Sequence, residues 1–161
     1  GGSDHSDLYL DVVNTLFSMD TSNILTINLV VGAQDSNTLN KLSGIIDDRL
    51  IVHKNINYMS KLMYEADIFV GASGSTTWER CSLYLPSIVC IVADNQKLIA
   101  SNLEEHGAVF VWKNMKELKK CFSRLAQSPN LYKKMQIKSG EVCDAEGVYR
   151  VTRKITESLR G

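Results

Sequence analysis

Two spacings of apolar residues alternate along the chain, and the alternation predicts an α/β protein. Short apolar runs, typical of buried parallel strands, are separated by segments in which apolar residues recur every three or four positions, as on one helical face. The predicted strands cover 24–31, 50–53, 68–70, 87–92 and 108–112. The predicted helices cover 8–17, 39–46, 59–66, 78–85, 97–105, 118–125, 131–139 and 148–160. Strands that alternate with helices predict a parallel sheet with helices on both faces, in three layers.

The start of the chain departs from this alternation of strands and helices. Gly1, Gly2 and Ser3 precede a helix, as residues that follow a first strand normally do, yet no strand comes before them. We expect either that the chain begins just after that strand or that the sheet has one member fewer. The length of 161 residues predicts one domain with a full core, 1–161, that ends in a helix at about 148–160.

Composition narrows the class of protein. Apolar residues make up 44% of the chain, charged residues 22%, and the net charge is zero, which argues against a nucleic-acid binder that works by bulk electrostatics. Residues 1–112 hold 6 basic and 13 acidic residues, whereas 113–161 hold 12 and 5, so the last third is basic. Its charges alternate with apolar residues at helical spacing, which favours solvated helices.

The four cysteines form no C-x-x-C pair and have no histidine at ligand spacing. Free thiols in a reducing cytoplasm are the expectation that fits this pattern best. No apolar run is long enough to cross a bilayer, and no signal peptide is visible, so we expect a cytoplasmic protein without a membrane span.

The loop between the strand at 68–70 and the helix at 78–85 is the main candidate for chemistry. Its small and hydroxyl-bearing residues, Gly71 to Thr77, would let backbone N–H groups approach an anion at a helix start. A diphosphate fits such a cradle without a metal or a cofactor. Thr76 and Glu79 also fit a capping box, which would occupy the Glu79 carboxylate locally. Residue types alone leave cradle and cap open.

The chain does not match two common nucleotide-binding motifs or the serine-hydrolase motif. The loop lacks the G-x-G-x-x-G pattern of dinucleotide sites, and no Gly-Lys-Ser/Thr of a P-loop occurs. Ser73, Asp94 and His106 follow the chain order of an α/β-hydrolase triad, but Ser75 stands where the nucleophile elbow needs glycine. We therefore do not favour a serine hydrolase.

The histidines and tryptophans favour structural roles. His53 ends a predicted strand and His106 ends a predicted helix, and neither has an evident carboxylate or nucleophile partner in the sequence. Trp78 and Trp112 are expected in the core rather than on a stacking surface.

The central stretch resembles a known family. Gly71-Ala-Ser-Gly-Ser-Thr-Thr-Trp-Glu-Arg-Cys, Leu85-Pro86 and Ala93-Asp-Asn-Gln96 look like the UDP-2,4-diacetamido-2,4,6-trideoxy-β-L-altropyranose hydrolase family of pseudaminic acid biosynthesis. The opening Gly-Gly-Ser-Asp also matches that family. More distantly, the pattern is similar to MurG-type transferases.

This resemblance implies a Rossmann-like domain, the C-terminal, nucleotide-holding half of a two-domain GT-B protein. Its partner would be UDP or a UDP-sugar, together with an N-terminal domain that carries the catalytic histidine, so no catalytic residue is expected on this chain. The implied diphosphate cradle is Ser73, Gly74, Ser75, Thr76 and Thr77, with Gly2 and Ser3 closing over it. Glu79 would bind the ribose, Ile56 and Met59 would flank the uracil, and Asn95 and Gln96 would face the sugar.

The implied reaction is attack of water on the anomeric carbon, C–O cleavage and release of UDP, with no metal. Two alternatives stay open at this point. A UDP-sugar glycosyltransferase half would use the same nucleotide site, and a non-catalytic nucleotide-sugar binding module would use it without chemistry. The Trp78 to Cys81 and Asp94 to Gln96 segments favour the hydrolase.

Overall fold

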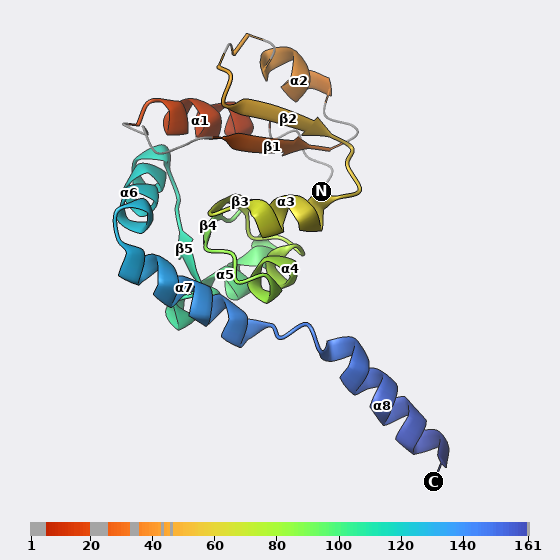
Figure 1. Cartoon of the computed structure of the whole chain (residues 1–161). Helices are drawn as coiled ribbons and strands as arrows, with labels where there is room; N and C mark the ends of the chain where they lie inside the picture. Colours follow the sequence, from red (N-terminus) through yellow and green to blue (C-terminus); the bar gives the residue numbers. More distant parts are fainter. Residues whose placement is uncertain (1–5, 20–25, 33–35, 43, 46, 161) are drawn as a thin grey trace. The chain divides into compact units, whose positions relative to one another are not determined.

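The structure is a computed structural model that describes residues 6–19, 26–32, 36–42, 44–45 and 47–160 (Figure 1). The chain divides into two compact units, Gly1–Leu62 and Met63–Gly161. Helix α3 (Met59–Glu65) contains the division. The first residues of the predicted strand at 24–31, and the predicted site residues Gly2 and Ser3, lie outside the described residues.

The first unit contains two helices and a parallel pair of strands. Its elements are α1 (Ser6–Phe17), β1 (Ile27–Val31), α2 (Ser36–Leu42) and β2 (Leu50–Lys54). β1 and β2 pair in parallel register from Ile27 opposite Leu50 to Val31 opposite Lys54. The two helices contact each other, and apolar side chains at Val13, Leu16, Val31 and Leu42 are buried.

The second unit contains the stretch with the candidate chemistry. Its elements are β3 (Phe69–Ala72), α4 (Thr77–Ser82), β4 (Ser87–Cys90), the 3₁₀ turn η1 (Asp94–Gln96), α5 (Lys97–His106), β5 (Val109–Val111), α6 (Met115–Ala126), α7 (Pro129–Val142) and α8 (Gly147–Arg160). The strands form a parallel sheet in the order β3-β4-β5. All four residues of β4, the central strand, are buried, as expected where both faces of a parallel sheet are covered.

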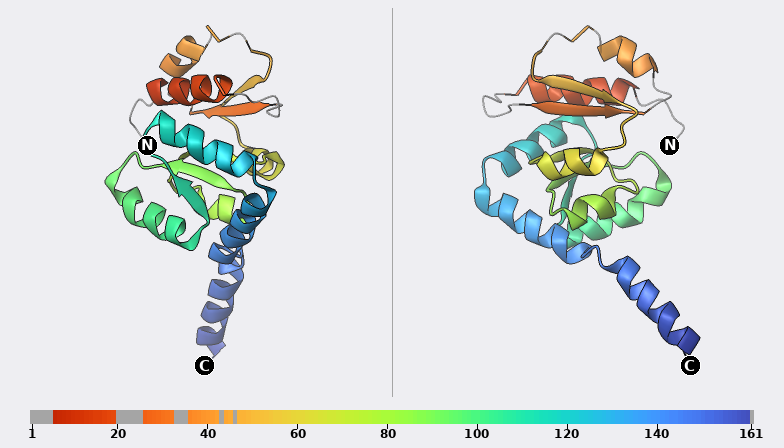
Figure 2. Two further views of the ribbon diagram at one scale, coloured as in Figure 1. Left: turned by 90° about the vertical axis from the view of Figure 1, so that its left-hand side faces the viewer. Right: turned by 45° about the vertical axis from the view of Figure 1, so that its right-hand side comes forward.

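Alternate side chains of these strands face helices on opposite sides of the sheet. Val89 and Val109 belong to an apolar cluster that also holds Cys81 of α4 and Leu103 of α5. Phe110 lies between the two valines of β5, and the guanidinium carbon of Arg124 in α6 stands 4.9 Å from its ring centroid. Figure 2 shows the strands between α5 and α6. The second unit is therefore a three-layer helix–sheet–helix arrangement.

Local capping signals set several helix ends. Gly107 ends α5 in the left-handed region at φ 82°, which glycine adopts without strain, as the sequence predicts. Asn114 caps α6 by accepting from the N–H of Glu117, while the Glu117 carboxylate accepts from the N–H of Lys113. Pro129 occupies the first turn of α7 after the N-cap Ser128.

Two hydrogen bonds from α7 fix it to the rest of the second unit. The buried Ser139 hydroxyl donates to the carbonyl of Ala108 at 3.1 Å, and the Tyr132 hydroxyl donates to the carbonyl of Asp67 at 3.0 Å. The last helix, α8, covers the expected terminal range, and none of its residues is buried.

The parallel α/β class predicted from the sequence is confirmed. The described strands form two hydrogen-bonded sheets, β1-β2 and β3-β4-β5, one in each unit, where the apolar pattern predicted a single sheet. Apolar periodicity identifies strands and helices, but it carries no information on which strands exchange hydrogen bonds.

Candidate functional site

The loop of residues 73–76 joins β3 to α4 at the carboxyl end of the sheet. The N–H of Ser73 donates to the carbonyl of Cys90 at 2.9 Å, which ties the start of the loop to the end of β4. The N–H of Thr77 donates to the carbonyl of Gly74 at 3.0 Å and closes a tight turn. Ligands of open α/β folds bind at this edge of the sheet, so the loop occupies a favourable place.

Three consecutive backbone donors of this loop are unused. Among the described residues, the N–H groups of Gly74, Ser75 and Thr76 donate to no backbone or side-chain acceptor. Ser75 is exposed, and Gly74 and Thr76 are partly exposed. Successive free N–H groups in a turn form a concavity that suits an anion.

The capping box that the sequence left open is not formed. Thr76 has helical backbone angles, φ −65° and ψ −3°, and its side chain makes no cap hydrogen bond. The exposed Glu79 carboxylate makes no hydrogen bond or ion pair with any described residue. No helix cap therefore uses the Glu79 carboxylate, which remains available to a ligand.

Two of the predicted cradle residues do not present their side chains at the surface. Ser73 and Thr77 are each 1% exposed. The Ser73 hydroxyl is buried without a hydrogen-bond partner among the described residues, and the Thr77 hydroxyl accepts from Arg80. The hydroxyls within reach of solvent on this loop are those of Ser75 and Thr76.

Arg80 lies behind the loop, and sequence reasoning assigned it no role. Its Nη2 donates to Thr77 Oγ1 at 3.0 Å, and its Nη1 donates to Thr76 Oγ1 at 3.3 Å and to the carbonyl of Ala72 at 3.4 Å. Its guanidinium carbon stands 4.0 Å from the ring centroid of Phe69. Only 1% of the residue is exposed, and this burial lowers the pKa of Arg80 to about 10. Thr76 and Thr77 precede Arg80 by one helical turn, which is the sequence signal that could have found it.

The second predicted loop follows β4 and includes η1. Asn95 is exposed, whereas the Gln96 side-chain oxygen accepts from the N–H of Val92 at 3.0 Å. This bond orients the Gln96 amide and leaves its NH₂ group without an acceptor among the described residues. Asp94 pairs with Lys97 at 2.6 Å. Asn95 and the Gln96 amide can thus donate to a polar ligand.

The remaining predicted binding residues belong to the other unit. Ile56 and Met59, both partly buried, lie between the end of β2 and the start of α3. His53 at the end of β2 has neighbours that the sequence did not reveal, because its ring nitrogens lie 2.8 Å from Asn28 Oδ1 and 3.2 Å from the Tyr58 hydroxyl. A structural role for His53 fits these contacts.

The serine-hydrolase alternative finds no support. The Ser73 hydroxyl has no partner among the described residues, and His106 Nε2 instead lies 3.1 Å from Glu141 Oε2. Ser73 and His106 therefore do not form the nucleophile–base hydrogen bond that such a mechanism needs.

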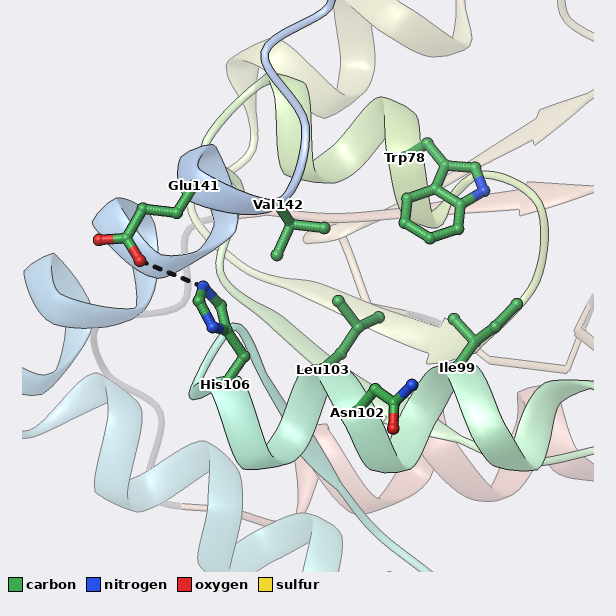
Figure 3. Close-up of a pocket in the computed structure, with 7 residues that line it drawn as sticks. All are labelled: Trp78, Ile99, Asn102, Leu103, His106, Glu141 and Val142. Atoms are coloured by element: carbon green, nitrogen blue, oxygen red, sulfur yellow. Dashed lines mark ion pairs between the residues drawn. The ribbon is translucent and has the colours of Figure 1, made fainter.

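A separate hollow lies between α4, α5 and α7 (Figure 3). It has a volume of about 360 Å³ and is lined by Trp78, Ile99, Asn102, Leu103, His106, Glu141 and Val142. Trp78 stands at one end and the His106–Glu141 pair at the other. The expectation that Trp78 lies in the core is wrong, because it is 48% exposed, whereas Trp112 is buried as expected. Helical spacing cannot distinguish a buried stripe from one that lines a surface hollow. None of the predicted UDP-binding residues that the structure describes lines this hollow.

Two features are absent from the part of the chain that the structure describes. No group of three or more His, Cys, Asp or Glu side chains is placed to hold a metal ion there. In the same part of the chain, no helix has both the length and the apolar character needed to cross a bilayer.

Comparison with curated proteins gives a relative that matches part of the chain. No family model matches the chain. An uncharacterized protein of Methanocaldococcus jannaschii is 34% identical over 93 residues, which are 55% of this chain and 19% of the relative. The chain thus spans about a fifth of the length of the curated relative that it matches.

Solved structures provide the fold. The chain is similar to the spinosyn rhamnosyltransferase SpnG, with a TM-score of 0.68 and 14% identity over 86% of this chain and 37% of that one. It is also similar to a UDP-N-acetylglucosamine 2-epimerase, with a TM-score of 0.68 and 15% identity over 93% of this chain and 40% of the epimerase. The glycosyltransferase VinC, solved in complex with dTDP, is similar with a TM-score of 0.60 and 17% identity over 89% of this chain and 36% of VinC. The chain therefore has the Rossmann-like α/β fold of the C-terminal domain of GT-B glycosyltransferases.

Proposed function

We propose that the chain is the nucleotide-binding half of a UDP-sugar hydrolase that releases UDP from a diacetamido-trideoxy hexose by C–O cleavage. The observation that carries the proposal is the row of unused N–H groups at Gly74, Ser75 and Thr76, close in sequence to an unpaired carboxylate at Glu79. Donors for a diphosphate and an acceptor for ribose hydroxyls then come from a single loop and the first turn of the following helix.

Exposure to solvent divides the loop residues between two roles. The backbone of Gly74 to Thr76 and the Ser75 and Thr76 hydroxyls bind the diphosphate, while the buried Ser73 and Thr77 support the loop from behind. Glu79 accepts from the ribose hydroxyls. Asn95 and Gln96 donate to the acetamido groups of the sugar. The family resemblance of the sequence assigns Ile56 and Met59 to the uracil and Gly2 and Ser3 to the phosphates, and we keep these four residues as part of the proposal on that ground alone.

The chemistry divides between this chain and the rest of a longer protein. Water adds to the anomeric carbon of the sugar, the bond from that carbon to the diphosphate oxygen breaks, and UDP leaves with the bonding electrons. The loop N–H groups stabilise the negative charge that develops on the departing diphosphate. The group that takes the proton from water belongs to an N-terminal domain, so this chain alone grips the leaving group without completing the reaction.

A glycosyltransferase half is the second candidate. The names of SpnG and VinC describe glycosyltransferases with the same fold. Such an enzyme would retain the same leaving-group site and replace water by an acceptor hydroxyl. Release of free sugar from the UDP-sugar by the full-length protein, without any added acceptor, supports the hydrolase, whereas strict dependence on an acceptor supports the transferase.

Titration of the 161-residue chain with UDP and with uridine tests the nucleotide site. We expect amide resonances of residues 74–76 and 79 to shift with UDP, and those of 74–76 to move far less with uridine, which lacks the diphosphate. Unchanged resonances of residues 74–76 at millimolar UDP would overturn the proposal.

The Glu79 variant separates ribose binding from a purely local role. Glu79→Gln keeps the shape of the side chain but removes its charge, so we expect weaker binding of UDP and a smaller loss for 2′-deoxy-UDP. Glu105→Gln, at an exposed position of α5, serves as the matched control and should bind UDP as the unaltered chain does. Equal losses for the two nucleotides in Glu79→Gln would refute ribose recognition by this carboxylate.

A further inference from the structure

Among the described residues, no carboxylate lies within ion-pair distance of the buried Arg80 guanidinium, although the neighbouring Glu79 carboxylate acts on it electrostatically. Only 1% of Arg80 is exposed. Its hydrogen-bond acceptors are the neutral oxygens of Ala72, Thr76 and Thr77. Burial of a charge that is not paired is costly, and neutral acceptors with a stacked ring compensate only part of the cost.

Two buried polar atoms beside the loop also lack partners. Arg80 Nε and the Ser73 hydroxyl make no hydrogen bond with any described residue. Buried donors of this kind are rare in folded proteins, and each calls for a specific explanation. Ser73 directly precedes the three free N–H groups in the chain, and Arg80 donates to the hydroxyl of Thr76, which carries the third of them.

The packing around Arg80 holds its charge in this place. The Phe69 ring stacks on the guanidinium, and Gly71 makes room for that ring, because a Cβ at position 71 would stand 2.7 Å from Phe69 Cζ. Gly71, Phe69 and Arg80 thus form a stack that ends at the two threonine hydroxyls. Movement of the guanidinium would shift the backbone that carries the free N–H groups.

We propose that Arg80 is a positioning residue for the diphosphate: it holds the turn of residues 73–77 in its anion-binding shape from behind and supplies the positive charge that the bound diphosphate balances. The inference rests on the proposed function. It adds that a buried side chain, Arg80, contributes to the preference for ligands that carry a diphosphate. Because the charge is buried, salt screens its attraction for the diphosphate less than it would screen a surface arginine.

The test measures the affinity of Arg80 variants of the 161-residue chain for UDP and for uridine. In Arg80→Met, which has a flexible apolar side chain, we expect UDP to bind at least about tenfold more weakly and uridine to bind unchanged. Arg80→Lys retains the charge but not the fork of donors, so it should recover part of the lost UDP affinity. Arg124→Met is the matched control, since it also removes an arginine stacked on a phenylalanine but lies on the opposite face of the sheet.

The outcomes separate this inference from the proposed function. If the unaltered chain binds UDP no better than uridine, the proposed function fails and the role of Arg80 fails with it. If the unaltered chain prefers UDP and Arg80→Met weakens UDP and uridine by the same factor, or neither, only the role of Arg80 is overturned.

A measurement on the unaltered chain covers the case in which Arg80→Met does not fold. The Nε–H resonance of Arg80 should move on addition of UDP or inorganic pyrophosphate and stay in place with uridine. A stationary Nε–H resonance, together with shifted amides at residues 74–76, would overturn the role of Arg80 while leaving the nucleotide site intact.

Discussion

The ring of Tyr84 packs against the backbone of Gly140, in space that the Cβ of any other residue would occupy. Tyr84 follows α4 and adopts a positive φ of 57°, whereas Gly140 lies in the last turns of α7. The missing side chain therefore allows α7 to pack closely on the α4 segment that carries the candidate site.

Replacement of Gly140 by alanine is expected to destabilise the chain. The added methyl overlaps with Tyr84 Cε1 and its neighbours, and overpacking of this kind costs about 1–3 kcal/mol of unfolding free energy. Urea unfolding followed by circular dichroism measures the loss. Gly147→Ala, where the added Cβ meets nothing within 4 Å, is the control and should be neutral or slightly stabilising. Equal stability of the two variants would contradict the close packing.

Gly71→Ala should weaken the stack beneath the loop. Its Cβ would stand 2.7 Å from Phe69 Cζ, so the ring must move away from the Arg80 guanidinium. We expect a loss of about 1–3 kcal/mol in unfolding free energy. Gly74→Ala is the comparison, because its Cβ has open space, and its unfolding free energy should stay close to that of the unaltered chain. A Gly71→Ala variant as stable as Gly74→Ala would show that Phe69 is free to shift.

Stability in acid should report the pair of Asp47 and Arg49. Hydrogen bonds from the Arg49 side chain lower the pKa of Asp47 from 3.8 to about 2. A carboxyl with a depressed folded pKa stabilises the fold above its unfolded pKa and loses that contribution as pH falls. The stability difference between the unaltered chain and Asp47→Asn should therefore shrink between about pH 4 and pH 2.

The control for the acid experiment is the neighbouring Asp48, which is exposed and forms no side-chain hydrogen bond or ion pair with a described residue. Chemical unfolding of Asp48→Asn across the same pH range should run parallel to the unaltered chain. A parallel course for Asp47→Asn as well would mean that the pair with Arg49 does not form in solution.

Cys81 and Cys90, the two buried cysteines, should resist alkylation more than the other two. Cys81 is 3% exposed, and burial raises its pKa from 9.0 to about 11, so little thiolate forms at neutral pH. Peptide mapping after iodoacetamide treatment should find label first at the partly exposed Cys121 and Cys143. Early labelling of Cys81 in the folded chain would contradict its burial.

The same thiol predicts a change of stability in alkali. Because the folded pKa of Cys81 is raised, its contribution is complete below pH 9 and is lost as pH rises towards 11. Cys81→Ala should unfold with a smaller decline over this range, which chemical unfolding at stepped pH measures.

Much of the fold could be predicted from local patterns. The glycine that ends α5, the break between α6 and α7 at Ser128 and Pro129, and the parallel strands around the Gly71–Thr77 loop all follow from signals that neighbouring residues carry. These features depend on backbone preferences and on which face of an element is apolar, and both can be read over a few residues.

The candidate site could be predicted only in part. The sequence predicted the loop and Glu79 as binding groups, which stays a prediction, and it left open whether Thr76 and Glu79 cap the helix. It gave Arg80 no role and expected Trp78 in the core. Each of these questions depends on contacts between residues that are distant in the chain. The N–H of Ser73, for example, donates to the carbonyl of Cys90, and the Arg80 guanidinium lies over the Phe69 ring.

The sequence by itself determined an α/β protein with a small-residue loop after an apolar strand, because propensity and periodicity are local. The tertiary structure decided that the Gly74 to Thr76 donors stay free, that Glu79 is not used by a cap, and that the Arg80 charge is buried against Phe69. The physical reason is that burial and hydrogen-bond competition are set by how α4 packs on β3 and β4, and local sequence does not specify that packing.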